Sequence, residues 1–352
     1  MVALVHIVAN GARTALGLGA PQSAAAHRAG IGAAALHPFM IDRAGDPMTL
    51  AMDCRLDPGL TAGARMLALA QAALQETCEL FESYTPVPRR VDLLLALPEP
   101  RPGFGPDEAK ALRAGLVATS DLPIHIGELN VSMLGHAAGL ALLGLAVERL
   151  RRGEAEMCMV GGVDSYLDPD TLDWLDGNRQ LIGAIARSGF VPGEAAGFCL
   201  LMTEAALERT GCPALAIVRA VATGRESRLI KTDELCFGSA LTAVVADLAT
   251  VLDAPAELID TVICDINGER YRGEEWGFTC LRTGQHFGDP TGYCSPADGW
   301  GDVGAASGPL FAMLSCEAAR RGYAKGPLSL LWASSEGGLR AAALLESPGA
   351  VR

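Results

Sequence analysis

One stretch of the sequence, residues 131–165 (VSMLGHAAGLALLGLAVERLRRGEAEMCMVGGVDS), constrains the fold more than any other. It predicts a tight turn at 134–137 and then a helix over 138–150, whose faces are nearly all covered by Ala, Gly and Leu. A helix that is apolar all round is buried. The basic pair and glycine at 151–153 are typical of a helix end, and 157–160 indicates a buried strand that ends in a glycine pair. The unit is therefore a turn, a buried helix, a buried strand and a glycine loop.

This unit resembles the centre of the beta-ketoacyl synthases, members of the thiolase-like superfamily. In those enzymes a nucleophilic cysteine lies on the turn at the N-terminus of the buried helix, where free N–H groups and positive potential lower a thiol pKa. Gly153, which ends the helix, follows His136 by 153 − 136 = 17 residues, and this spacing puts His136 at the position of the cysteine. Because the same field disfavours an imidazolium, we expect His136 to stay neutral. The resemblance implies that the nucleophile is missing.

A second motif supports the resemblance. Residues 187–197, RSGFVPGEAAG, are similar to the family segment G-F-[VI]-x-G-E-[GA]-A-[GA], and we interpret Glu194 as a buried structural acid. Similar glycine motifs extend over roughly residues 4–346. The resemblance implies an α/β fold of the thiolase type, with duplicated βαβαβαββ halves in a five-layer α-β-α-β-α arrangement. We expect an N-terminal half at 1–208 and a C-terminal half at 209–352, each with five strands.

The pattern along the rest of the chain also favours a layered α/β fold, because helical and strand-like segments alternate. Helical periodicity covers 22–28, 61–80, 106–117, 168–180, 204–213, 241–252 and 307–321, with Thr61 as the expected N-cap of its helix. Apolar runs typical of buried strands cover 91–97, 198–202, 214–222, 261–266, 328–332 and 339–345.

The second half departs from the family at the remaining catalytic positions. By the resemblance, the two family histidines fall at Asn267 and, after alignment of 304–306 with the family's G-A-A, at Gly301, while the family lysine falls at Pro296. Asparagine cannot shuttle a proton near neutral pH. The gate loop, G-F-G-G in the family, has Glu336 in place of its phenylalanine. Together with the missing nucleophile, these changes imply that the fold is kept while carbon–carbon condensation is lost.

The residues leave other chemistry open. His136 could itself accept an acyl group, although a neutral imidazole in a polar remnant of the old site is the preferred interpretation. Ser132 could be a displaced nucleophile, but no histidine or acid can be placed beside it from the sequence. The loop 284–302 contains possible metal ligands, which are His286, Asp289, Cys294, Asp298 and Asp302. They mix hard and soft types without a recognised spacing, so we prefer a solvated lid loop and expect neither a metal nor a cofactor.

Composition and charge limit the partners. The 352 residues carry a net charge of −13, which argues against nucleic acid and anionic membranes. Hydrophobic residues make up 50% of the chain, so we expect a large core, an oligomer interface, or both. The ten cysteines form no CxxC pair, as is usual for the free thiols of a cytosolic protein. The N-terminus indicates a strand and not a signal peptide. The longest apolar run, 137–147, is too short to cross a bilayer. We therefore expect a cytoplasmic protein.

Three functions remain open at this point. The first is a non-condensing pseudoenzyme, a homodimer that acts as a scaffold or adaptor, with the apolar region 124–134 at its interface. Degenerate synthase-like chains of this kind occur in bacterial type VI secretion clusters, which implies a role with secreted effectors. The second is an acyltransferase or thioester hydrolase that uses His136. The third is a chain-length-factor-like partner of an active synthase, although such partners normally have glutamine at this position. Paired arginines at 89–90, 151–152 and 320–321 could dock an acyl carrier protein, but such pairs are usually solvated helix ends.

Overall fold

A computed structural model describes residues 4–84, 90–184, 186–229, 231–232 and 234–349. Its main sheet has nine strands in the order β5-β4-β6-β7-β1-β8-β11-β10-β9. These strands are β1 (Val5–Thr14), β4 (Arg90–Ala96), β5 (His125–Ser132), β6 (Met157–Ser165), β7 (Glu194–Thr203), β8 (Ala216–Arg225), β9 (Thr261–Cys264), β10 (Leu328–Ser334) and β11 (Leu339–Glu346). A separate hairpin consists of β2 (Ala34–Ile41) and β3 (Pro47–Ala51).

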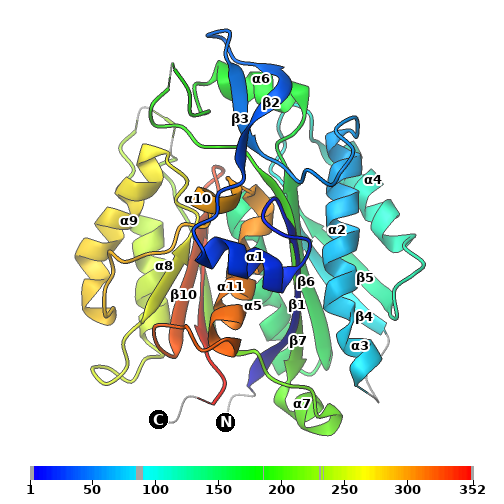
Figure 1. The fold of residues 1–352 in the computed structure, drawn as a ribbon. Coiled ribbons are helices and arrows are strands. Elements are labelled where there is room, and N and C mark those ends of the chain that lie inside the picture. Colours follow the sequence, from blue (N-terminus) through cyan, green and yellow to red (C-terminus); the bar gives the residue numbers. More distant parts are fainter. Residues whose placement is uncertain (1–3, 85–89, 185, 230, 233, 350–352) are drawn as a thin grey trace.

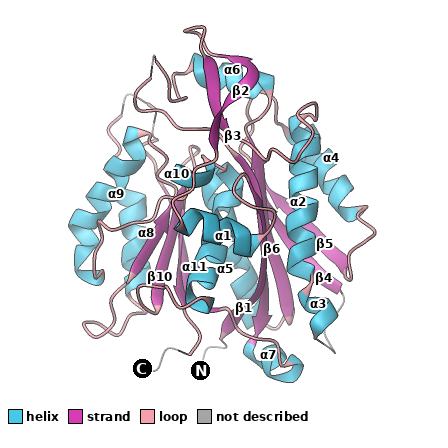
Figure 2. Ribbon diagram, in the orientation of Figure 1, coloured by secondary structure: helices cyan, strands magenta, loops and turns pink. Residues whose placement is uncertain are grey.

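Helices cover the outer faces of the sheet, and further helices lie between its two parts, in the middle of the molecule (Figure 2). They are α1 (Ala20–Arg28), α2 (Ala62–Cys78), α3 (Leu80–Ser83), α4 (Pro106–Val117), α5 (Ala138–Arg151), α6 (Pro169–Gly177), α7 (Glu204–Thr210), α8 (Ser239–Ala249), α9 (Arg270–Thr283), α10 (Ala297–Trp300) and α11 (Ser307–Arg320). Short 3₁₀ turns are η1 (Gly135–Ala137), η2 (Gly284–His286) and η3 (Gly304–Ala306). Within the described residues, no helix combines the length and the hydrophobicity that crossing a bilayer requires.

The molecule is layered around two buried helices, α5 and α11. One apolar core surrounds these helices and includes the inner faces of both parts of the sheet. A second core lies under α2 and α4, and a third lies under α8 and α9, on the two outer faces (Figure 1). The result is the predicted α-β-α-β-α arrangement. The β4 strand is hydrogen-bonded to parallel strands on both sides, as its unbroken apolar sequence indicates.

The two central helices approach each other through glycines. A Cβ atom at Gly139 of α5 would lie 2.5 Å from Cδ of Pro309, and one at Gly308 of α11 would lie 2.7 Å from the backbone nitrogen of Leu140. Any larger side chain at these positions would push the helices apart. The small residues of the organising stretch are therefore required by helix packing, and not only by burial.

Most of the expected elements are found close to their predicted positions. The predicted helix at 106–117 is α4 with the same bounds, and the hydroxyl of Thr61 caps α2 as expected. The strand after α5 is longer than predicted, because β6 continues through its glycine pair to Ser165. The glycines are needed inside this strand, since a Cβ atom at Gly162 would lie 2.3 Å from the carbonyl oxygen of Ala305.

The two halves of the sheet are not equal. The first half supplies β1 and β4–β7, whereas the second supplies only β8–β11 among the described residues, so the expectation of two five-stranded halves is wrong. On the open side of β9, Cys294 makes only an isolated parallel bridge with Ile263. Pro290 and Pro296 flank this bridge, and proline cannot donate to a strand ladder. The predicted boundary at 208/209 falls inside α7 and stays a prediction.

Candidate functional site

The structure places His136 at the mouth of the central helix, in the turn η1 that leads into α5. Gly135 has a φ of 67°, a conformation that glycine adopts without strain. Ser335, from the second half, holds the turn: its hydroxyl accepts a hydrogen bond from Ala137 N at 2.9 Å and donates to a carbonyl of the turn at 2.5 Å. The imidazole is therefore fixed in a buried position at the start of the helix.

The partner of His136 is Asp302, which lies just before η3, the matching turn at the start of α11. Nε2 of His136 lies 2.8 Å from Oδ1 and 3.0 Å from Oδ2 of Asp302. The carboxylate also accepts hydrogen bonds from Asn267 Nδ2 at 2.6 Å and from Gly304 N at 2.8 Å. Because a carboxylate only accepts, Nε2 must carry the proton in this contact. The turns that begin the two central helices thus meet through a histidine–aspartate pair.

The other predicted positions are only partly brought together. Asn267 reaches the site, but Gly301 packs against Val191 and Ala51, and its neighbour Asp302 is the residue that faces the histidine. Ser132 ends β5 and Pro296 precedes α10; neither lines the cavity beside the histidine. From the sequence, Asp302 was considered only as a metal ligand, because the alignment on 304–306 placed its neighbour Gly301 at the family histidine.

The expectation that His136 stays neutral is contradicted. Burial lowers the pKa of His136, but the carboxylate of Asp302 more than offsets burial and raises the pKa above its ordinary value of 6.5. Burial would raise the pKa of Asp302, yet His136 and Arg272 hold it far below the ordinary range. The pair therefore favours the imidazolium–carboxylate form. The field of the helix N-terminus can be expected from the sequence, whereas the carboxylate that the second half supplies cannot.

A fully buried arginine supports the pair from α9. Nη1 of Arg272 donates to Asp265 at 2.5 Å and to the carbonyl of Ser334 at 2.9 Å, and its Nη2 lies 3.3 Å from Nε2 of His136. Since that Nε2 already donates its proton to a carboxylate, the last contact is a close approach of two cations and not a second hydrogen bond. Glu269, 3.5 Å from Nε of Arg272, adds a negative charge that offsets this repulsion.

A cavity of about 470 Å³ lies beside His136. Its apolar wall consists of Met133, Leu134, Trp174, Leu175, Phe190 and Leu339, and its polar wall of Glu99, Arg101, His136, Asp164, Tyr166, Arg225 and Glu336. All ten cysteines belong to the described part of the chain, and none of them lines this cavity. The cavity has a size typical of small-molecule sites but offers no thiol nucleophile.

Ion pairs and hydrogen bonds hold the turn between β10 and β11, where the gate loop was expected. Glu336 is paired with Lys231; burial would raise the pKa of Glu336, but the lysine lowers it. Glu99 accepts a hydrogen bond from Gly337 N at 2.9 Å, and burial raises the pKa of Glu99. The predicted gate residue Glu336 is thus present at the cavity, but it is tied to a lysine.

The sequence reasoning missed Arg101, which links the cavity wall to the histidine–aspartate pair. Nη2 of Arg101 donates to Asp164 at 2.6 Å, and its guanidinium lies 4.2 Å from the centre of the Tyr166 ring. The Tyr166 hydroxyl lies 3.3 Å from Oδ1 of Asp302. Arginine in a segment rich in Pro and Gly is ordinary in sequence terms, so no local signal identified it.

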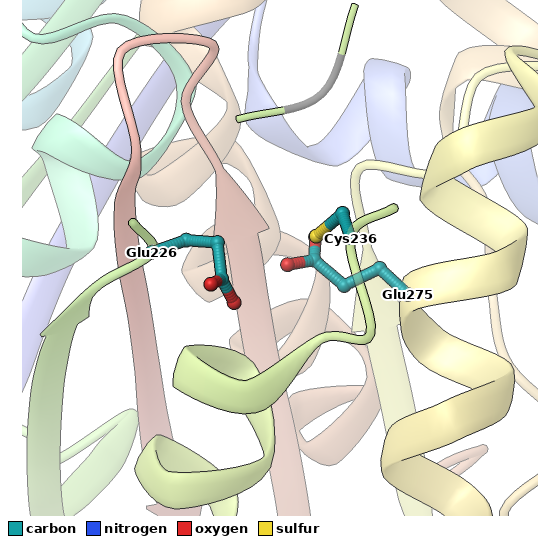
Figure 3. Close-up of side chains that lie close together, drawn as sticks. All are labelled: Glu226, Cys236 and Glu275. Atoms are coloured by element: carbon teal, nitrogen blue, oxygen red, sulfur yellow. The ribbon is translucent and has the colours of Figure 1, made fainter. Parts of the chain in front are cut away.

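One group of side chains has metal-like spacing away from this cavity. The ligand atoms of Glu226, Cys236 and Glu275 lie within 4.8 Å of one another, and Figure 3 shows the thiol and the Glu275 carboxylate side by side. Glu275 already accepts a hydrogen bond from Nε of Arg340 at 2.6 Å and one from Ser334 at 2.8 Å. The arginine neutralises the carboxylate, so this group is explained as a buried ion pair and we assign no metal to it.

The residues considered as metal ligands in the loop 284–302 do not form a cluster of ligand atoms within the described structure. Cys294 instead has its sulfur 3.1 Å from Nε2 of His27, and Asp289 accepts hydrogen bonds from Thr291. Cys294 and Asp289 therefore have local structural partners.

Comparison with known proteins agrees with this architecture. Residues 135–206 match the model of the beta-ketoacyl synthase N-terminal domain. Among solved structures, a type II polyketide ketosynthase in complex with its acyl-carrier protein and bound to a hexaketide (AntDE:AntF) is 14% identical, with a TM-score of 0.79 and coverage of 99% of this chain and 100% of that chain. The ishigamide ketosynthase/chain length factor is 19% identical, with a TM-score of 0.71 and coverage of 98% of this chain and 100% of that chain. The oxazolomycin ketosynthase domain OzmH KS7 of Streptomyces albus JA3453 is 17% identical, with a TM-score of 0.75 and coverage of 99% of this chain and 75% of that chain.

In its fold the chain therefore resembles these ketosynthases. More particularly, residues 135–206 are similar to the beta-ketoacyl synthase N-terminal domain, as the sequence motifs predict. At these levels of identity the structural likeness establishes the fold and does not by itself carry an activity.

Proposed function

We propose that this chain is a non-condensing beta-ketoacyl synthase-like protein that binds a ligand or a protein partner instead of forming carbon–carbon bonds. The observation that carries the proposal is the His136–Asp302 ion pair at the mouth of α5. A thiolate at this position would attack an acyl thioester. Asp302 raises the pKa of His136 and so favours the ring that is protonated on both nitrogens, which has no lone pair and cannot attack.

The neighbouring groups support the same conclusion. Asn267 cannot transfer a proton near neutral pH, and the carboxylate of Asp302 is committed to three donors within 3.0 Å. Its very low pKa makes it a poor general base. No described residue at the cavity therefore supplies the combination of nucleophile and proton shuttle that condensation needs.

The acyltransferase hypothesis is tested by intact-protein mass spectrometry after incubation with octanoyl-N-acetylcysteamine. We expect no adduct in the native protein. The matched control is a His136→Cys variant, which restores a thiol at the helix mouth and should gain the mass of an octanoyl group. A stable adduct on the native protein that disappears in His136→Ala, but not in His286→Ala, a variant of a half-buried histidine outside the cavity, would overturn the proposal.

A protein partner is the second part of the proposal. Edge strand β5 has no neighbour on its outer side among the described residues, and Leu145 of the otherwise largely buried α5 is 44% exposed. These features favour a homodimer, an adaptor for secreted effectors, or pairing with an active synthase in the manner of a chain-length factor. Light scattering separates a soluble homodimer from a chain that needs a different partner.

The paired arginines give little support to carrier-protein docking. Arg152 is paired with Glu148 at the end of α5, and both Arg320 and Arg321 are paired with Glu317 at the end of α11. Arg89 lies outside the described residues. We therefore base the proposed partnership on the sheet edge and not on these arginines.

A further inference from the structure

The cavity beside His136 contains a ring nitrogen that makes no hydrogen bond within the described structure. Nε2 of His136 is committed to Asp302, while Nδ1 has no hydrogen-bond partner among the described residues. The side chain is 7% exposed and lines the cavity, so Nδ1 is the polar ring atom left for a ligand. In the imidazolium form this nitrogen is a charged N–H donor, and a charged donor prefers an anionic acceptor.

Two further features of the same cavity favour an anion. His136 is at the N-terminal end of α5, a helix of 14 residues, where the helix dipole attracts negative charge. Arg225, at the end of β8, lines the cavity and has no ion-pair or hydrogen-bond partner among the described residues. The other cation at the wall, Arg101, is already paired with Asp164.

The carboxyl groups of the wall do not cancel this preference. Glu336 is neutralised by Lys231, and Asp164 is neutralised by Arg101. Glu99 is the remaining acid; its carboxylate accepts a backbone hydrogen bond from Gly337, and burial makes this group easier to protonate than an ordinary glutamate. The cation at the cavity that has no ion-pair partner among the described residues is therefore Arg225.

The rest of the cavity is apolar. Trp174 and Leu175 of α6, together with Phe190, line it with hydrophobic side chains. A ligand that satisfies both sides has one anionic end and one hydrocarbon end. We propose that this cavity binds a free monocarboxylate with an apolar tail, without covalent attachment, and holds its carboxylate at Nδ1 of His136 and the guanidinium of Arg225. This inference rests on the proposed non-condensing function and names the ligand class for that site.

The test is isothermal titration of the full-length protein at pH 7 with octanoate, octanamide and octylammonium, which share a tail and differ in charge. We expect octanoate to bind at least ten times more tightly than the other two. Arg225→Gln should weaken octanoate by about tenfold, which corresponds to 1.4 kcal/mol. The matched control is Arg228→Gln, an exposed arginine on the same segment that does not line the cavity, and it should leave binding unchanged.

A second variant, His136→Asn, removes the charged donor and should also weaken octanoate by at least tenfold without affecting octanamide. If this variant fails to fold, the comparison of Arg225→Gln with Arg228→Gln decides alone whether the inference holds. Equal affinity for octanoate and octanamide, tighter binding of octylammonium, or octanoate binding that survives both substitutions would overturn the inference. An octanoyl adduct in the mass experiment would instead overturn the proposed function, so the two failures are distinguishable.

Discussion

The ion pair of His136 with Asp302 joins two residues that are 166 positions apart and nearly sealed from solvent. Removing one member of a buried pair leaves an uncompensated charge, which typically costs about 3–5 kcal/mol. We therefore expect Asp302→Ala to lower the free energy of unfolding by about that amount in urea titrations. The control, Asp247→Ala on the exposed face of α8, should change it by less than about 0.5 kcal/mol. A loss below 1 kcal/mol for Asp302→Ala would contradict the assignment of a buried ion pair.

The same pair gives the protein a defined pH dependence. The folded-state pKa of His136 is raised above 6.5, so its contribution to stability is fully present below pH 6.5 and is lost as pH rises through the folded-state value. The pKa of Asp302 is lowered, so its contribution is present above pH 3.8 and is lost as pH falls below that value. We expect the difference in unfolding free energy between the native protein and His136→Gln to be largest between these limits. A difference that grows above pH 7 would contradict the raised pKa.

At the level of single residues, the sequence located the histidine but not its surroundings. His136 was predictable because the turn, helix and glycine end are local signals. Asp302, Arg272 and Arg101 were not predictable from the sequence. Each acquires its role from contacts with residues 35 or more positions away, or from its burial in the folded chain. A polar residue in a loop or a short helix carries no local signal of either. The local helix signals therefore predicted the position of the candidate site. The charged residues around it come together only in the folded chain, so they could not be predicted from the sequence.

The central helices are the elements on which the architecture depends, and their contact is specific to glycine. A Cβ atom at Gly308 would meet backbone atoms of α5 at 2.7–3.1 Å, so Gly308→Ala should destabilise the protein by about 1–3 kcal/mol through overpacking. Gly277 is the matched control, since it is exposed inside α9 and a Cβ atom there meets nothing within 4 Å. Gly277→Ala should stabilise the protein by up to about 1 kcal/mol. Thermal unfolding of both variants measures the contrast, and a neutral Gly308→Ala would show that the helices can separate.

Elements with a weak local pattern were the ones that the sequence did not reveal. The segment of α9 carries two glycines and the buried polar residues Arg272 and Glu275, so its helical periodicity is poor although its packing is good. Edge strand β5 has one buried residue and β2 has none, so their sequences lack the continuous apolar run of a central strand. Where tertiary contacts stabilise an element in this way, local propensity is not informative.

For the whole molecule, the main open question is its assembly, and two exposed leucines allow a matched test. If the proposed homodimer uses α5 and the edge of the sheet, Leu145→Glu should convert it to a monomer, because a buried charge at an interface is costly. Leu281→Glu on α9, where the leucine is 84% exposed, should leave the oligomer unchanged. Light scattering across a concentration series measures both. A dimer that survives the first change but dissociates with the second would place the interface on the opposite side.

The contact of Gly139 with Pro309 also determines how the gene can be divided. Each half contributes one helix to a shared interior, so a fragment made alone has that helix unprotected against water. Cutting the chain at Gly211, an exposed turn residue after α7, should yield two pieces that aggregate when each is produced singly. Simultaneous production in one cell should restore a soluble complex, which the yield of each piece in the cleared lysate would reveal. A fragment that is soluble and monomeric without its counterpart would mean that the interior is less shared than the glycine contact indicates.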